Sequence, residues 1–235
     1  MRALGDTLFY YGIFMLMNER NGKIKALICI LNMEVIQSSE DKVMAELNLA
    51  QYTDQLIELY SNDISDNLDS FSLGMIREIS ADYFIFESVS ESGTFDALQI
   101  RVKQCVAKIE TQSAYIDLYQ FMININEKAN LYDPYKLLTH SPNYGNYLDP
   151  LASVLNIAKH EDKLISCVTT DEQDLITGKV IDLSDMSVTM LLFNFETNTL
   201  EEQITIPLSN VIQVYAISEQ NYFLEAYLDN STLMG

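Results

Sequence analysis

The chain carries two copies of one sequence pattern, and this duplication restricts the possible folds more than any other feature does. Residues 47–57 match residues 155–165 at an offset of 108 (155 − 47). Further along, Gly74 and the residues after it match Gly178 and its successors at an offset of 104 (178 − 74). The first copy therefore holds four more residues between these points, an insertion that a surface loop tolerates and a core does not. We expect the chain to build the same structural unit twice.

Each copy has the sequence pattern of short β-strands. In the first copy the segment 83–86 is aromatic and β-branched, a polar turn follows at 90–94, and apolar residues then alternate with polar ones over 98–102, which we match to 204–208. Alternation with turn-forming residues between the runs predicts five short strands in each copy. Pro207 falls inside the fourth strand expected in the second copy, which favours an edge position or a bulge there.

Helices are expected before and after each set of strands. Apolar residues at helical spacing predict helices over 41–50 and 149–159, and Asp149 directly ahead of a proline fits a helix N-terminus. The tyrosine-rich segments that end the copies, beginning near Tyr115 and Tyr222, are interpreted as helical. A strand is the alternative, because apolar residues occur on both faces of these segments.

A glycine and a following acidic-apolar-Ser turn occur in both copies: Gly74 with 78–80, and Gly178 with 182–184. Together with a helix ahead of five short strands, this pattern resembles the Sm-like (SH3-like) small β-barrel. A glycine suits the second strand because a short strand curves around a small barrel only where no side chain obstructs the bend. The resemblance implies a mainly β (α+β) fold of two tandem five-stranded barrels. Through their strand edges the two barrels could pair with each other within the chain, or they could form a homo-oligomer; the sequence leaves both open. The sequence lacks the Asn-bearing and basic-Gly motifs of RNA-binding Sm proteins, so RNA recognition is not implied.

The pattern divides the chain into four parts. Residues 1–40 are apolar on both sides of an Asn-Gly pair, which predicts a β-hairpin; a buried helix and a membrane-associated segment are the alternatives. None of the apolar runs reaches the length of about 20 residues that a bilayer span needs. The first repeat follows at 41–125, then a Tyr/Pro-rich linker at 126–148, which we expect to pack against the repeats, and then the second repeat at 149–235.

The net charge limits the partners of this chain. It has 14 Lys+Arg against 34 Asp+Glu, which gives a formal net charge of −20. Such a surface repels phosphate groups, so we expect neither direct nucleic-acid binding nor an anionic membrane as partner. A protein with a basic surface is the natural partner, because opposite charges steer association. The alternative is that the charge serves solubility alone.

Two acidic loops at matching places in the copies are the candidate partner-binding sites. Their residues are Asp63, Asp66 and Asp69 in the first copy, and Asp171, Glu172 and Asp174 in the second. Neither loop has the Asp-x-Asp-x-Asp-Gly spacing of a calcium loop, so we expect no bound metal there and no cofactor elsewhere. Solvated turns that present matching negative faces to a basic partner are the expectation.

Side chains with catalytic chemistry are sparse. The two histidines, His140 and His160, lie in the linker and at a helix end, and the widely spaced Cys29, Cys105 and Cys167 indicate reduced thiols in the cytoplasm. No nucleophile elbow or phosphate-binding glycine loop is present in the sequence. We therefore predict no catalytic residues and a non-enzymatic protein-interaction or regulatory module. One alternative is an acidic inhibitor, of the immunity or anti-defence type, that occupies the cationic cleft of a nuclease; another is an enzyme with a site between the barrels.

Overall fold

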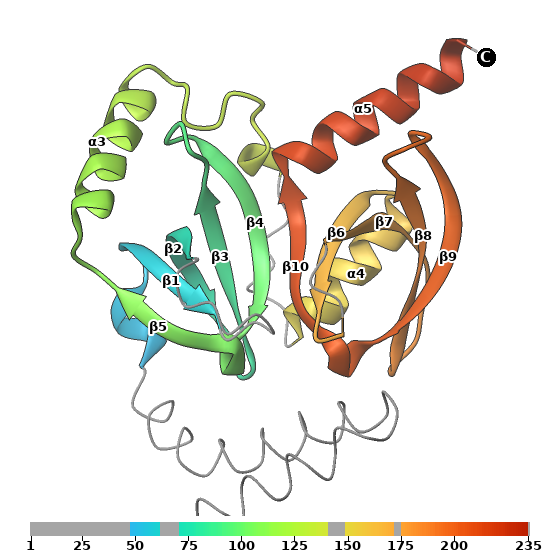
Figure 1. Ribbon diagram of the computed structural model, residues 1–235, viewed down its shortest axis with the longest axis horizontal. Coiled ribbons are helices and arrows are strands. Elements are labelled where there is room, and N and C mark those ends of the chain that lie inside the picture. The colour runs from blue at the N-terminus through green and yellow to red at the C-terminus, as the bar shows by residue number, and fades with distance from the viewer. Residues whose placement is uncertain (1–47, 62–70, 141–148, 172–174, 235) are drawn as a thin grey trace, which may run out of the picture. The chain divides into compact units, whose positions relative to one another are not determined.

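The computed structural model describes residues 48–61, 71–140, 149–171 and 175–234 (Figure 1). What we call the first half contains β1 (Leu56–Ser61), β2 (Ser72–Ile79), β3 (Tyr83–Val89), β4 (Phe95–Val102), β5 (Val106–Glu110) and α3 (Ala114–Lys128). The second half contains α4 (Pro150–His160), β6 (Leu164–Thr169), β7 (Ile176–Leu183), β8 (Ser187–Asn194), β9 (Thr199–Pro207), β10 (Val211–Ser218) and α5 (Glu219–Met234). Short 3₁₀ helices are η1 (Leu49–Tyr52), η2 (Lys103–Cys105), η3 (Leu138–His140) and η5 (Leu208–Asn210).

The prediction of five strands per copy is confirmed in these residues, and so is the mainly β, α+β class. The helix predicted over 149–159 is α4, and the Asp149 side chain caps it by accepting a hydrogen bond from the Ala152 N–H at 3.0 Å. The tyrosine-rich tails are the helices α3 and α5. The hairpin predicted within 1–40 lies outside the described residues.

All ten strands belong to one antiparallel sheet with the order β5-β1-β2-β3-β4-β10-β6-β7-β8-β9. The halves meet where β4 pairs with β10, with Ile100 opposite Val214. Closing each half into a barrel of its own would need β4 to pair with β5 and β9 with β10, and neither pairing occurs among the described strands. Two separately closed barrels are therefore not confirmed: the outer edge of β4 is occupied by a strand of the other half.

The two halves have the same strand register. Gly74 on β2 lies opposite Ser88 on β3, and Gly178 on β7 lies opposite Leu192 on β8, so both members of each pair differ by 104 positions. A β-bulge begins two residues after each glycine. A bulge bends its strand and increases the local twist, so each glycine lies next to a bend.

Glycine is required at these two positions because the neighbouring strand comes very close. A Cβ atom built on Gly74 would lie 2.2 Å from the backbone oxygen of Glu87, and one on Gly178 would lie 2.4 Å from that of Leu191. Backbone atoms cannot retreat as a flexible side chain can. Any larger residue would therefore push β2 away from β3, or β7 away from β8.

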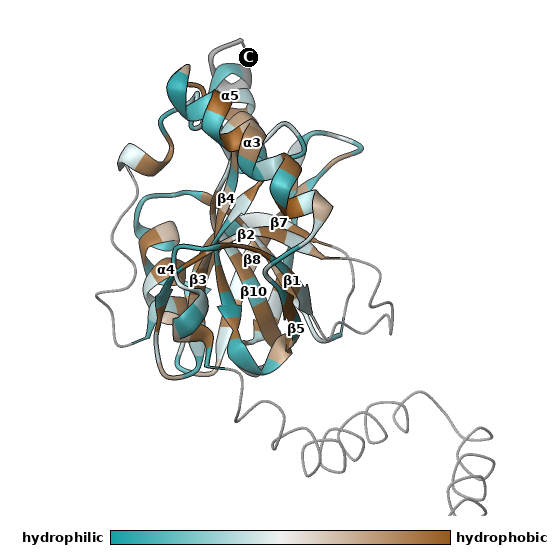
Figure 2. Ribbon diagram, turned by 90° about the vertical axis from the view of Figure 1, so that its left-hand side faces the viewer, coloured by the Kyte–Doolittle hydropathy of each residue, from teal (hydrophilic) through white to brown (hydrophobic). Residues whose placement is uncertain are grey.

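The main hydrophobic core lies under α4 and extends across the junction between the halves. It combines α4 residues such as Leu155 with second-half strand residues such as Val214 and with Ile85, Phe95 and Ile100 of the first half. A smaller cluster lies beneath α3. Figure 2 shows apolar colouring along the strands and a mixture of apolar and polar residues on α3 and α5. The shared core means that the two halves stabilise each other.

Candidate functional site

The two outermost strands of the sheet, β5 and β9, each have one edge without a strand partner in the described part of the chain. Pro207 ends β9, which confirms its predicted edge position. Most side chains of β9 are exposed, including Glu201 and Glu202. The hydroxyls of Thr197 and Thr199 donate to the Glu201 carboxylate, and these hydrogen bonds lower the pKa of Glu201. The β9 edge is therefore accessible and negatively charged.

The strands β5 and β10 differ in length, and among the described strands β10 has a partner on both sides whereas β5 has one. These strands are the fifth strands of their halves, yet β5 has five residues and β10 has eight. The last residues of β10, Ile217 and Ser218, pair with β4 of the first half. The residues at 111–113, which follow β5 at the matching place, are not in a strand. A partner strand at the edge of β5 would allow it to extend in the same way.

The predicted acidic loops are largely beyond what the structure describes. Asp63, Asp66, Asp69, Glu172 and Asp174 lie outside the described residues. Asp171 is exposed, and its carboxylate accepts a hydrogen bond from the side chain of Asn210. The partner-binding role of both loops stays a prediction.

The described residues offer little for metal binding or nucleophilic catalysis. No group of three or more His, Cys, Asp or Glu side chains among them could hold a metal ion. His160 is exposed at the C-terminal end of α4, and His140 ends η3. Burial raises the pKa of the Cys105 thiol to about 11, so at neutral pH it is protonated and a poor nucleophile.

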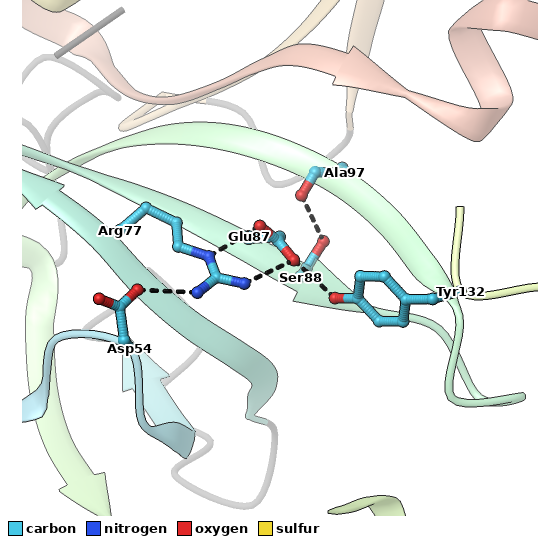
Figure 3. Close-up of polar contacts among 6 residues, drawn as sticks. All are labelled: Asp54, Arg77, Glu87, Ser88, Ala97 and Tyr132. Atoms are coloured by element: carbon cyan, nitrogen blue, oxygen red, sulfur yellow. Dashed lines mark hydrogen bonds and ion pairs between the residues drawn. The ribbon is translucent and has the colours of Figure 1, made fainter. Parts of the chain in front are cut away.

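A first polar cluster ties the linker to the sheet (Figure 3). Arg77 on β2 holds Glu87 on β3 in a two-point ion pair, with Nε–Oε2 at 2.8 Å and Nη2–Oε1 at 3.0 Å. Its Nη1 donates to Asp54 at 2.7 Å, and the hydroxyl of Tyr132 donates to Glu87 at 2.6 Å. Burial and the Glu87 charge raise the pKa of Tyr132, which stays neutral. Glu87 is buried and Arg77 is half-buried, and their charges are matched within the cluster, so we interpret this cluster as structural.

A second polar cluster surrounds Arg101 on β4, whose side chain is buried with only 5% of its surface exposed. Its Nε donates to the Gln99 side-chain oxygen and its Nη2 to the Ser72 hydroxyl, both at 2.7 Å. The guanidinium carbon lies 4.7 Å from the ring centroid of Phe86. None of the ion pairs between described residues includes Arg101. Burial lowers the pKa of Arg101 to about 10, so it keeps its charge at neutral pH.

Arg101 faces a cavity of about 250 Å³ between the halves. The lining comes from β1, β2, β3, β4, η2 and β5 of the first half and from β6 and β10 of the second, and it includes Cys105, Gln213 and Tyr215. Burial raises the pKa of Tyr215, so this phenol is neutral. The described lining has no carboxylate. The cavity therefore carries one positive charge and several neutral polar groups.

A larger cavity, of about 370 Å³, lies between α4 and α5 and differs in its charges. Lys163 and Glu225 line it and form an ion pair at 3.3 Å, and Glu225 also accepts the Leu164 N–H at 2.7 Å. The side-chain nitrogen of Asn221 is a buried polar atom without a hydrogen-bond partner in the described part of the chain. The opposite charges of Lys163 and Glu225 are thus paired with each other.

The sequence analysis missed Arg101 because it matched the copies one residue out of step on the fourth strand. It set Ile100 against Ile206. In the structure Arg101 lies opposite Phe84 and Ile206 lies opposite Val188, so Arg101 and Ile206 are the equivalent residues, 105 positions apart. A one-residue slip exchanges the two faces of a strand. With the offset of 105, the two copies differ by an arginine against an isoleucine at a strand position. That difference would have pointed to Arg101.

No helix in the described ranges is long and apolar enough to cross a membrane. Comparison of the chain with protein-family models, with curated proteins and with solved structures finds no match.

Proposed function

We propose that this chain is a non-enzymatic interaction module, made of two tandem Sm-like units, that binds a partner protein with a basic surface through the exposed edge of β9. The observation that carries the proposal is the acidic edge of β9, which ends a ten-stranded sheet and has no strand partner among the described residues. An inhibitor that docks against a protein with a cationic cleft is a special case of this function.

Two features support the Sm-like interpretation. The strand order within each half is fifth-first-second-third-fourth, and the bulges and glycines occur at equivalent positions. The halves are joined through the fourth strand of one and the fifth strand of the other. A free thiol at Cys105 suits a reducing compartment such as the cytoplasm.

The edge of β9 has the two properties that strand addition needs. Its unpaired backbone groups can hydrogen-bond an extended segment of a partner, and its side chains select the partner by charge. Glu201 and Glu202 lie on this strand, and the net charge of −20 attracts a basic protein over a distance. A lysine-bearing extended segment is thus the occupant that we assign to the edge.

The test uses a designed peptide of alternating Lys and Val and its Glu/Val counterpart, with binding measured by calorimetry. We expect the basic peptide to bind at low salt, to weaken as salt rises and to increase the protection of β9 amides in hydrogen exchange. The variant E201K/E202K should bind about tenfold more weakly, a loss of about 1.4 kcal/mol. The control variant E127K/D229K makes the same change of charge on the exposed faces of α3 and α5. Equal loss in both variants, or no protection of β9, would contradict the proposal.

Self-association is a second candidate function, and the pairing of β4 with β10 favours it. The fourth strand of the second half, β9, could pair with β5 of another copy in the way that β4 pairs with β10 within the chain. Such head-to-tail contacts give rings or filaments. Light scattering distinguishes the two candidates. Screening of the −20 charge by salt strengthens self-association, whereas it weakens the binding of a basic partner.

A further inference from the structure

The Arg101 cavity is a positively charged site inside a strongly acidic protein. The guanidinium is buried, its Nε and Nη2 are held by Gln99 and Ser72, and no described residue bonds its Nη1. Arg101 is also among the residues that line the cavity. A buried charge is unfavourable unless an opposite charge accompanies it. No carboxylate is among the described residues that line the cavity. The charge of Asp96 acts on Arg101, but Asp96 is linked to the guanidinium through Gln99 and Ser88 and forms no direct ion pair with it.

The second half shows that the fold does not need an arginine at this place. Register places Ile206 at the position of Arg101. The two residues that hold the guanidinium are also isoleucines in the second half. By strand register, Ile204 is equivalent to Gln99 and Ile176 is equivalent to Ser72. An all-isoleucine version of the cluster therefore packs in the same strand framework. The strand framework alone therefore does not account for the polar version in the first half.

We propose that the cavity between β4 and β10 binds a small organic anion, whose carboxylate or phosphate group pairs with Arg101. The guanidinium is presented as a fixed plane, because Gln99 and Ser72 hold one side and the Phe86 ring covers a face at 4.7 Å. A planar, preorganised guanidinium matches the oxygens of carboxylate and phosphate groups.

The remaining lining sets the size and character of the ligand. Neutral groups of Tyr215, Gln213 and Cys105 can hydrogen-bond its other end, and Leu59 and Phe84 provide apolar contacts. The volume of about 250 Å³ is below the range of about 300–1,000 Å³ typical for drug-sized ligands. The ligand is therefore a compact molecule with one anionic group. It would touch both halves, since the lining includes strands from each.

The experiment measures binding to the full chain by calorimetry and by the shift in melting temperature. The probes are benzoate, ribose 5-phosphate and inorganic phosphate, with benzamide and ribose as neutral controls. We expect benzoate or ribose 5-phosphate to bind and to raise the melting temperature, and the neutral controls to do neither. The carboxylate and the organic phosphate distinguish the two possible anionic groups. Binding of inorganic phosphate alone would overturn the assignment of an organic ligand.

The decisive variant replaces the polar cluster with the residues of the second half: S72I/Q99I/R101I. It should fold, because the second half packs these residues, and it should lose anion binding at least tenfold. The single variant R101K keeps the charge but not the planar fork, so it should bind with reduced affinity. Unchanged binding in the folded triple variant would refute the proposal. So would a failure of every anion to bind the unmodified protein at about 10 mM, the weak limit of useful affinity.

Discussion

The first and second halves of the sheet share a strand order and register but differ in what fills equivalent positions. Arg101 and Gln99 of the first half correspond to Ile206 and Ile204 of the second. The ion pair of Arg77 with Glu87 falls where the second half has Ile181 and Leu191. A comparison within one chain thus separates what the fold requires from what one copy has added. Both halves have a glycine in the second strand, so the fold requires it. The buried charged residues occur in the first half alone at these positions, so the fold does not require them.

The largest expected effect concerns the feature that the halves share. Gly74→Ala and Gly178→Ala should each destabilise the chain by about 4 kcal/mol, because the new Cβ would lie 2.2 or 2.4 Å from a backbone oxygen of the neighbouring strand. Urea unfolding followed by circular dichroism measures the loss. A small effect in one half only would break the equivalence of the two glycines.

The next effect tests the ion pair that only the first half contains. Glu87→Leu leaves Arg77 without its two-point partner and should cost about 3 kcal/mol. Adding Arg77→Ile copies the second half and should recover most of that loss. The free energies of unfolding of the two single variants and the double variant form a double-mutant cycle. A double variant as unstable as the sum of its parts would show that the cluster is needed for folding.

A smaller effect of opposite sign is expected at the cavity. The triple variant S72I/Q99I/R101I removes a buried charge that forms no ion pair with a described residue, so without ligand it should be more stable by about 1–2 kcal/mol. Thermal unfolding in a buffer without carboxylate or phosphate measures the gain. Gln99→Ile alone removes a hydrogen bond from Arg101 and should be destabilising. If Gln99→Ile and the triple variant changed the melting temperature in the same direction and by the same amount, this explanation would be contradicted.

The smallest effect concerns pH and the exposed edge strand. Hydrogen bonds from Thr197 and Thr199 lower the pKa of Glu201 in the folded chain. The stabilisation from such a group is present above its unfolded-state pKa and is lost as the pH falls through its folded-state pKa. Glu201→Gln should therefore slightly flatten the fall in melting temperature below pH 5, near the usual glutamate range of about 4.3. Glu127→Gln on α3 is the control, and an identical change in both would remove the assignment to Glu201.

Local sequence patterns predicted the elements because period and turn chemistry are local properties. Alternation gave the ten strands, and Asp149 with its following proline gave the start of α4. Pairing of the two units within the chain was one of two alternatives, and the sequence could not choose between it and pairing with another copy. A strand pattern does not specify which free edge a strand will meet, and the structure shows β4 paired with β10. The sequence resemblance led us to expect closed units, and the edge of β4 is instead used to join the halves.

The candidate site was less predictable than the fold. Arg101 and Ile100 are adjacent, and a shift of one residue decides which of them is equivalent to Ile206. Burial of Arg101 depends on Ser72, which is distant in sequence, and on strand β10 of the other half. The acidic loops were found easily because they are local clusters, but most of their residues lie outside the described ranges.

The core that α4 shares with Phe95 and Ile100 has a consequence for how the molecule melts. Because these first-half side chains are buried against second-half residues, unfolding either half alone would expose apolar surface of the other. The two copies are therefore thermodynamically one cooperative unit, although each has the strand complement of a small domain. We therefore expect a single unfolding transition for the two halves.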